Sequence, residues 1–157
     1  MKITETASKM LKRAIAEPVL AGLAKTMDAQ NQFTIGEIRR FNNGAGPYPV
    51  GQHRLGHRSG RWSGSLNAPP AVVTGSKVAS TIGSNIVYAR IHEFGGVIVP
   101  KKAKALRFKI GGSWITTNKV IMPARAPITT GIQKRKPNYE KAVSASIIAT
   151  LRGLGYK

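Results

Sequence analysis

The sequence predicts an α+β domain: N-terminal helices, then a small antiparallel β-sheet of four or five strands with a short inserted helix, then a C-terminal helix packed on the sheet. Three observations predict it. Apolar residues recur at three- and four-residue steps near both ends, short β-branched runs separated by glycine breaks fill the middle, and 157 residues suit one domain. We therefore treat residues 1–157 as a single domain.

The N-terminal segment predicts two helical stretches. Apolar residues recur at helical spacing over residues 3–15 and again over residues 19–27. Pro18 lies between them, and proline is tolerated in the first turn of a helix but disrupts a helix interior. A kink or a fresh start is therefore expected there. Residues 33–41 fit either one more helical turn or a short strand.

Residues 42–61 predict a long basic loop. The segment holds five glycines and two prolines but almost no aliphatic residues, so it lacks the material for a core. Interleaved arginines and histidines indicate an exposed segment that is mobile when the protein is alone. It is either an assembly element that a partner orders or a flexible insertion without a partner.

After a short turn the sequence takes on β character. Its β-branched runs surround a Thr-Gly-Ser-Lys turn and a Gly-Gly break, which predicts short antiparallel strands. A last helix is expected from about Ile128 to Leu154, weakened near its start by Pro137 and stopped by Gly153 and Gly155.

The chain is strongly basic. It carries 25 Lys and Arg against 6 Asp and Glu, a formal net charge of +19. Such an excess favours polyanionic or acidic partners through electrostatic steering and counterion release, and a solvated basic face is the plain alternative. Cysteine is absent, so disulfides and thiolate metal sites are excluded. No apolar run is long enough for a membrane span or a signal peptide, so a soluble protein without membrane contact is expected.

The pair His92-Glu93 is the strongest candidate for chemistry. A zinc-protease helix needs H-E-x-x-H, and Gly96 occupies the place of the second histidine. His53 and His57 are three apart, but on a glycine-broken segment that does not form a chelating helix face. Serine-hydrolase elbows and phosphate-binding loops are also absent, and six acids leave little for paired-carboxylate chemistry. We expect no catalytic residues, no metal, no cofactor and no enzyme.

A structural interpretation suits the same stretch. Residues around position 90 fit one or two turns of helix that Gly95 and Gly96 bring to an end. His92 is then a packed or half-exposed histidine, and Glu93 pairs with a nearby lysine or arginine.

Recognition of nucleic acid by sequence is not supported. The aromatic residues are spread singly, and neither an RNP-like run nor a helix-turn-helix pattern is visible. The charge supports non-specific proximity to DNA only.

Four segments in order, SGRWSGSL, IGSNIVYARIHEFGG, PKKAKALRF and VIMPAR, resemble the virion-morphogenesis or tail-completion (tail-terminator-like) family of tailed bacteriophages. The resemblance spans residues 59–130. After Arg125 the family's usual Pro-Phe-Leu is replaced by APITTGI, which leaves the packing of the last helix open. The motif residues are Ser63, Gly64, Leu66, Gly83, Ser84, Tyr88, Ala89, His92, Glu93, Phe94, Gly95, Gly96, Pro123, Ala124 and Arg125.

The resemblance implies a structural virion protein of the phage neck or tail top, without a catalytic site. Such a protein acts in tail completion or head-tail joining, is made in the cytoplasm of the bacterial host and resides in the virion. The implied partners are further copies in a ring, commonly hexameric, neighbouring neck and tail-tube proteins, and packaged DNA by non-specific contact. The alternative is a basic nucleic-acid-binding or ribosome-associated protein. Candidate residues of an assembly interface are Arg54, Arg58, Arg61, Lys101, Lys102 and Lys104.

Overall fold

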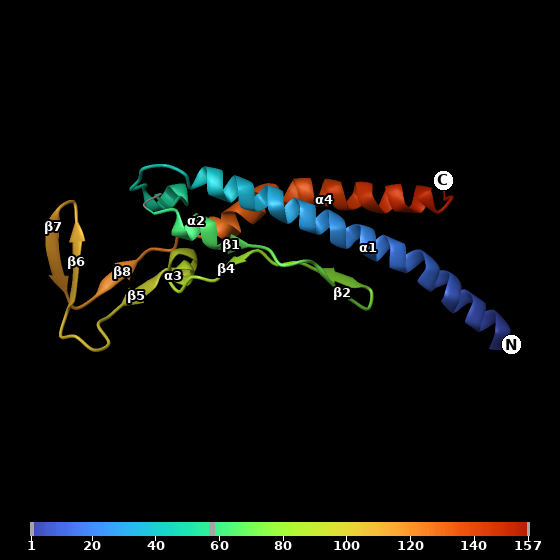
Figure 1. Cartoon of the computed structure of the whole chain (residues 1–157), viewed down its shortest axis with the longest axis horizontal. Coiled ribbons are helices and arrows are strands. Elements are labelled where there is room, and N and C mark those ends of the chain that lie inside the picture. Colours follow the sequence, from blue (N-terminus) through green and yellow to red (C-terminus); the bar gives the residue numbers. More distant parts are fainter. Residues whose placement is uncertain (1, 57–58, 157) are drawn as a thin grey trace.

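The computed structural model describes the backbone of residues 2–56 and 59–156, and the side chains of these residues from 14 onward. Its elements run in this order: α1 (Lys2–Phe41), a 3₁₀ turn (Val50–Gln52), α2 (Arg61–Ser65), β1 (Leu66–Asn67), β2 (Val72–Thr74), β3 (Lys77–Ala79), β4 (Gly83–Ser84), α3 (Ala89–Phe94), β5 (Gly96–Ile98), β6 (Leu106–Ile110), β7 (Ser113–Thr117), β8 (Val120–Met122) and α4 (Pro127–Gly153). The α+β prediction is confirmed, with helices at both ends and short antiparallel strands between them (Figure 1).

Helix α1 is one continuous helix of 40 residues. A fresh start at Pro18 is therefore wrong, because the helix continues through the proline in spite of the backbone hydrogen bond that proline removes. Residues 33–41, which fitted either helix or strand, are helical. Thr34, Ile35 and Ile38 are buried there, and this burial is what favours the helix.

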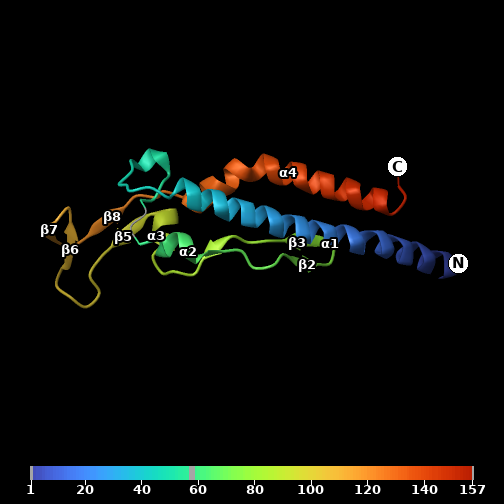
Figure 2. The same cartoon turned by 45° about the horizontal axis from the view of Figure 1, so that its top comes forward.

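Helix α4 packs along α1, side by side in both views (Figures 1 and 2). The expected position on the sheet is therefore wrong, although the predicted extent of the helix is confirmed to within a residue. The two helices come close at Gly131, where an added Cβ would lie 2.2 Å from Ile38 Cγ1. Arg135 spans the interface, donating to Gln30 Oε1 at 2.7 Å and lying 3.4 Å from Glu37 Oε1.

Within residues 2–56 and 59–156 the strands form four separate antiparallel pairs of two strands each, so the single sheet of four or five strands is also wrong. The pairs are β1 with β4, β2 with β3, β5 with β8, and β6 with β7. They follow one another along the length of the molecule, which keeps them from joining into one sheet (Figure 1). The Thr-Gly-Ser-Lys segment does form the turn of a hairpin, between β2 and β3.

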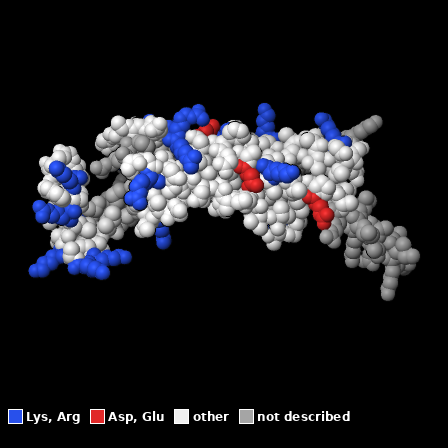
Figure 3. All heavy atoms as spheres, viewed as in Figure 1, with Lys and Arg blue, Asp and Glu red and all other residues white. Residues whose placement is uncertain are grey.

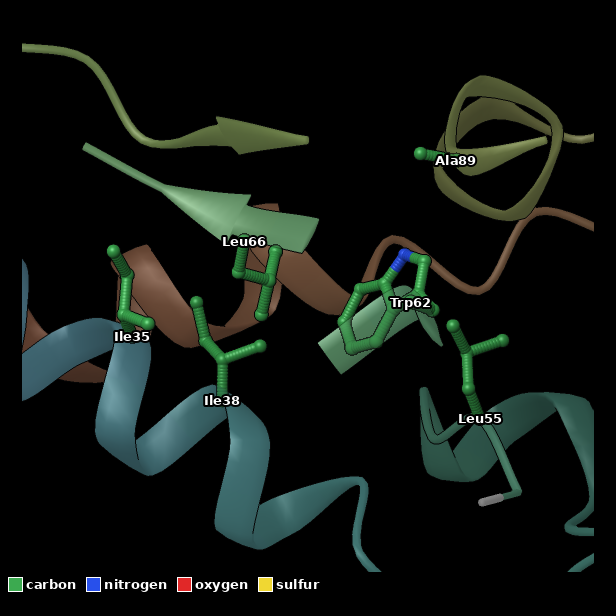
Figure 4. Packing of buried hydrophobic residues seen from close by; sticks show 6 residues of the cluster. All are labelled: Ile35, Ile38, Leu55, Trp62, Leu66 and Ala89. Atoms are coloured by element: carbon green, nitrogen blue, oxygen red, sulfur yellow. The ribbon is translucent and has the colours of Figure 1, made fainter. Parts of the chain in front are cut away.

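The core is small and lies where α1, α2, β1 and α3 meet (Figure 4). Its buried apolar residues are Ile35, Ile38, Leu55, Trp62, Leu66 and Ala89. The chain exposes 11407 Å² of surface, whereas a compact monomer of its mass, 16.9 kDa, exposes about 7,700 Å². About 3,700 Å² more surface is therefore in contact with solvent than a globular monomer of this size requires.

The basic loop contributes to this core. Leu55 is buried, and its backbone N–H donates to Asn42 Oδ1 at 2.6 Å. The expectation that residues 42–61 hold no material for a core is therefore wrong for Leu55.

Candidate functional site

The carboxylate of Glu93 caps the start of α4. Only 8% of the residue is exposed, and its Oε2 and Oε1 accept hydrogen bonds from the backbone N–H groups of Ile128 at 3.0 Å and Thr129 at 2.8 Å. Amides in the first turn of a helix have no partner within the helix, and the helix dipole favours a negative charge beside them. The described contacts of Glu93 are therefore with these backbone amides, in place of the basic side chain expected from the sequence.

His92 joins the same two elements through its backbone. Its carbonyl accepts hydrogen bonds from the backbone N–H groups of Arg125 at 2.9 Å and Ala126 at 3.2 Å. The half-buried ring lies edge-on to Tyr88, with centroids 5.9 Å apart. Burial lowers the pKa of His92, and the nearby Arg125 cation lowers it further. The described part of the chain brings no three His, Cys, Asp or Glu side chains together as a metal site requires.

Gly95 ends α3 as predicted, for a reason that only the tertiary structure shows. Its φ of 69° lies in the left-handed region, and an added Cβ would come within 2.7 Å of the backbone N of Ala124. The glycine therefore both ends α3 and lets the segment after β8 pass close to it.

Arg125 fastens the basic loop to the start of α4. Its guanidinium donates to the backbone carbonyls of Tyr48 at 2.8 Å, Arg54 at 2.9 Å and Pro49 at 3.4 Å. The Arg125 carbonyl lies 3.1 Å from Nδ1 of His53. The loop thus has packing partners in the chain itself.

The three arginines expected at an assembly interface differ in their surroundings. Arg54 is half-buried, donates from Nε to the Phe41 carbonyl at 2.6 Å and stacks over the Tyr48 ring at 4.1 Å. This arginine therefore holds the loop against α1. Arg61 is exposed at the start of α2, while Arg58 lies outside the described residues.

The residues that carry the resemblance gather in two places. In the first, α2 and β1 meet β4, where Leu66 pairs with Ser84 and Ser65 Oγ lies 2.6 Å from Ser84 Oγ. In the second, α3 meets the segment that follows β8. The first group comprises Ser63, Gly64, Leu66, Gly83 and Ser84, and the second Tyr88, Ala89, His92, Glu93, Phe94, Gly95, Gly96, Pro123, Ala124 and Arg125. Ser84, His92, Glu93 and Arg125 join these elements by hydrogen bonds, whereas Phe94 is 73% exposed.

Residues 96–122, from β5 to β8, form an arm that projects away from the paired helices (Figures 1 and 2). Strand β5 pairs with β8, and β6 pairs with β7 at the far end. Large apolar side chains remain exposed along it, and these are Val97, Ile98, Val99, Ile110, Trp114, Ile115 and Ile121.

The arm is also purely basic. It contains six lysines and arginines and no acid, and all six are exposed: Lys101, Lys102, Lys104, Arg107, Lys109 and Lys119. In Figure 3, Lys and Arg gather over the arm, whereas the acidic residues visible on that face lie over the helices. The arm therefore contains the three lysines expected at an interface, Lys101, Lys102 and Lys104. It also contains Lys109 and Trp114, which the sequence analysis did not single out. Apolar and basic residues alternate in LRFKI, residues 106–110, and this alternation could have predicted a strand with one apolar and one basic face.

Comparison with protein families, with curated proteins and with solved structures finds no significant match to this chain. The resemblance to the phage tail-completion family therefore stays a prediction. None of the helices in the described ranges is long and apolar enough to cross a membrane.

Proposed function

We propose that this chain is a structural subunit that acts by assembling with further copies of itself into a ring. The arm is the observation that carries this proposal. It is a two-stranded ribbon whose seven large apolar side chains are each between 38% and 68% exposed. An isolated two-stranded ribbon is marginally stable in water, and a further strand or a packing surface makes it stable.

The energetic incentive for assembly is large. Fully burying one large apolar side chain contributes about 1.5–3 kcal/mol. Burying several side chains of the arm in an interface would therefore offset the conformational entropy that the arm loses there. Within the described ranges, each of β5, β6, β7 and β8 has one edge that is not paired with another strand, and its backbone groups bond to water. A strand of a neighbouring subunit added to such an edge would replace these bonds to water with backbone hydrogen bonds, so loss of the water does not oppose assembly.

The surface area supports the same proposal. The excess of about 3,700 Å² lies within the roughly 2,000–5,000 Å² that obligate protein interfaces bury. In a ring, each subunit uses two different patches, one for each neighbour. An arm at one end of a helical body supplies one such patch without blocking the other.

The setting we propose is the neck or tail top of a tailed bacteriophage, in tail completion or head-tail joining. Support for it comes from the ordered motifs at residues 59–130. The ring would be hexameric and would contact neighbouring neck and tail-tube proteins in the virion, after synthesis in the host cytoplasm. A role without catalysis accords with motif residues that hold helices and strands together.

A basic nucleic-acid-binding or ribosome-associated protein is the second candidate. The formal net charge of +19 favours it. A chain that stays monomeric and retards DNA or RNA in a gel at physiological salt would favour this second candidate over a ring-forming subunit.

Native mass spectrometry and negative-stain imaging of the purified chain test the assembly proposal. Val97 and Ile121 pair across β5 and β8 and are 60% and 68% exposed, so changing both to serine should leave the monomer folded while removing the ring. Ile148→Ser provides a matched control, because Ile148 is an exposed apolar residue on α4. A wild-type chain that stays monomeric, or a ring that both variants leave intact, would refute assembly through the arm.

The phage setting needs its own test. Mass spectrometry of purified virions of a phage that encodes the chain should detect it, and particles made without it should accumulate as unjoined heads and tails. Complete infectious particles lacking the chain would exclude this setting while leaving the ring untouched.

A further inference from the structure

The β6–β7 hairpin has two chemically different faces. Successive residues of a strand point to opposite faces, and residues paired across an antiparallel ladder share a face. Arg107 pairs with Thr116 and Lys109 with Trp114, which places these four residues on one face. The opposite face carries Leu106, Phe108, Ile110, Ser113, Ile115 and Thr117.

Exposure follows this division in part. Leu106 and Phe108 on the apolar face are half-buried, while Ile110 and Ile115 on the same face are 59% and 38% exposed. On the other face Arg107 and Lys109 are exposed and Trp114 is 62% exposed. The apolar face suits a protein surface such as a neighbouring subunit, and the basic face remains free for a different partner.

The basic face is partly organised in the free chain. The Arg107 guanidinium carbon lies 4.8 Å from the centroid of the Trp114 ring, a stacked cation–π pair. Stacking limits the rotamers of the arginine, so less conformational entropy is lost when the guanidinium binds a phosphate through two hydrogen bonds. Lys109 lies directly across the ladder from Trp114 and adds a second cation to the same face.

The charge continues beyond this face. Lys101, Lys102 and Lys104 are exposed in the segment that leads into β6, and residues 96–122 contain no acid to neutralise them. Cations without neighbouring acids suit the uniform negative charge of a phosphate backbone.

We propose that the basic face of the β6–β7 hairpin binds the phosphate backbone of double-stranded DNA without sequence preference. The major groove of B-DNA is wide enough to admit a two-stranded ribbon, so the hairpin can lie in the groove while its cations reach the phosphates on either side. Discrimination between bases is not expected, because the proposed contacts of Arg107 and Lys109 are with phosphates, and phosphate contacts carry no sequence information. The proposal requires neither the ring nor the phage setting.

Fluorescence anisotropy of a labelled DNA duplex, titrated with the full chain over a range of salt, tests it. We compare R107Q/K109Q with K25Q/K141Q, a control that removes the same charge from exposed positions on α1 and α4. Each phosphate contact contributes about 0.9 to the slope of log K against log salt, so the hairpin variant should flatten the slope by about two and weaken binding to unrelated sequences equally. The control should leave the slope near that of the wild type.

Tryptophan emission gives a second reading of the same contact. The chain has two tryptophans, of which Trp62 is buried and Trp114 is exposed. Duplex DNA should therefore quench the wild-type emission and leave the emission of W114F nearly unchanged.

Three results would overturn the proposal. One is equal salt slopes for the hairpin variant and its control. The others are tighter binding to single-stranded DNA or to polyglutamate than to the duplex, which would assign the face to unpaired bases or to an acidic protein. Native mass spectrometry of the same samples keeps the two proposals apart, since a wild-type chain that forms the ring but does not bind the duplex contradicts only this one.

Discussion

Replacing Glu93 tests whether the His92-Glu93 pair is architecture. Glu93→Ala removes the acceptors of two backbone N–H groups at the start of a 27-residue helix. Loss of one capping bond costs about 0.5–2 kcal/mol, and loss of a partly buried charge at a helix N-terminus costs up to about 2 kcal/mol. We therefore expect a loss of about 2–4 kcal/mol in the free energy of unfolding, a large fraction of the 5–15 kcal/mol typical of a domain. Glu93→Gln keeps one neutral acceptor and should lose about half as much.

Urea denaturation, monitored by far-ultraviolet circular dichroism, measures the free energy of unfolding of each variant. The variants can be compared when the dependence of this free energy on urea concentration has the same slope in each. Glu140→Ala is the matched control, because Glu140 is a largely exposed acid on the same helix, 3.9 Å from Lys136. Its removal should change stability by less than about 0.5 kcal/mol. A Glu93→Ala loss no larger than that of the control would falsify the capping role.

Three further predictions concern the packing around this junction. Because the pKa of His92 is lowered in the fold, the unfolded chain binds a proton before the folded chain does as the pH falls below 6.5, so the free energy of unfolding should decrease in this range. His92→Gln should make this decrease smaller in urea titrations at a series of pH values. Gly131→Ala should destabilise by about 1–3 kcal/mol because its Cβ would overlap Ile38, and combining it with Ile38→Ala should cost less than the sum of the two changes; strict additivity would contradict this contact. Arg125→Ala should release the basic loop and speed tryptic cleavage after Arg54, and an unchanged digestion rate would show that other contacts hold the loop.

Local signals in the sequence determined the fold class and several element boundaries. The helical spacing near the C-terminus predicted α4 to within a residue at each end, because hydrophobic periodicity and glycine stops act over a few neighbouring residues. The Thr-Gly-Ser-Lys turn and the end of α3 at Gly95 were predicted for the same reason. The stretch PKKAKALRF indicated Lys101, Lys102 and Lys104 as candidate interface residues, and all three are exposed.

Contacts between residues far apart in the sequence decided the rest. Helix α1 continues through Pro18. Helix α4 packs on α1, and the close approach of Gly131 to Ile38 joins positions nearly a hundred residues apart. Local propensity carries no information about such pairs. The hydrogen bonds between Glu93 and the amides of α4 also join residues far apart in the sequence. The two faces of the β6–β7 hairpin depend on its register, since a slip of one residue would exchange them.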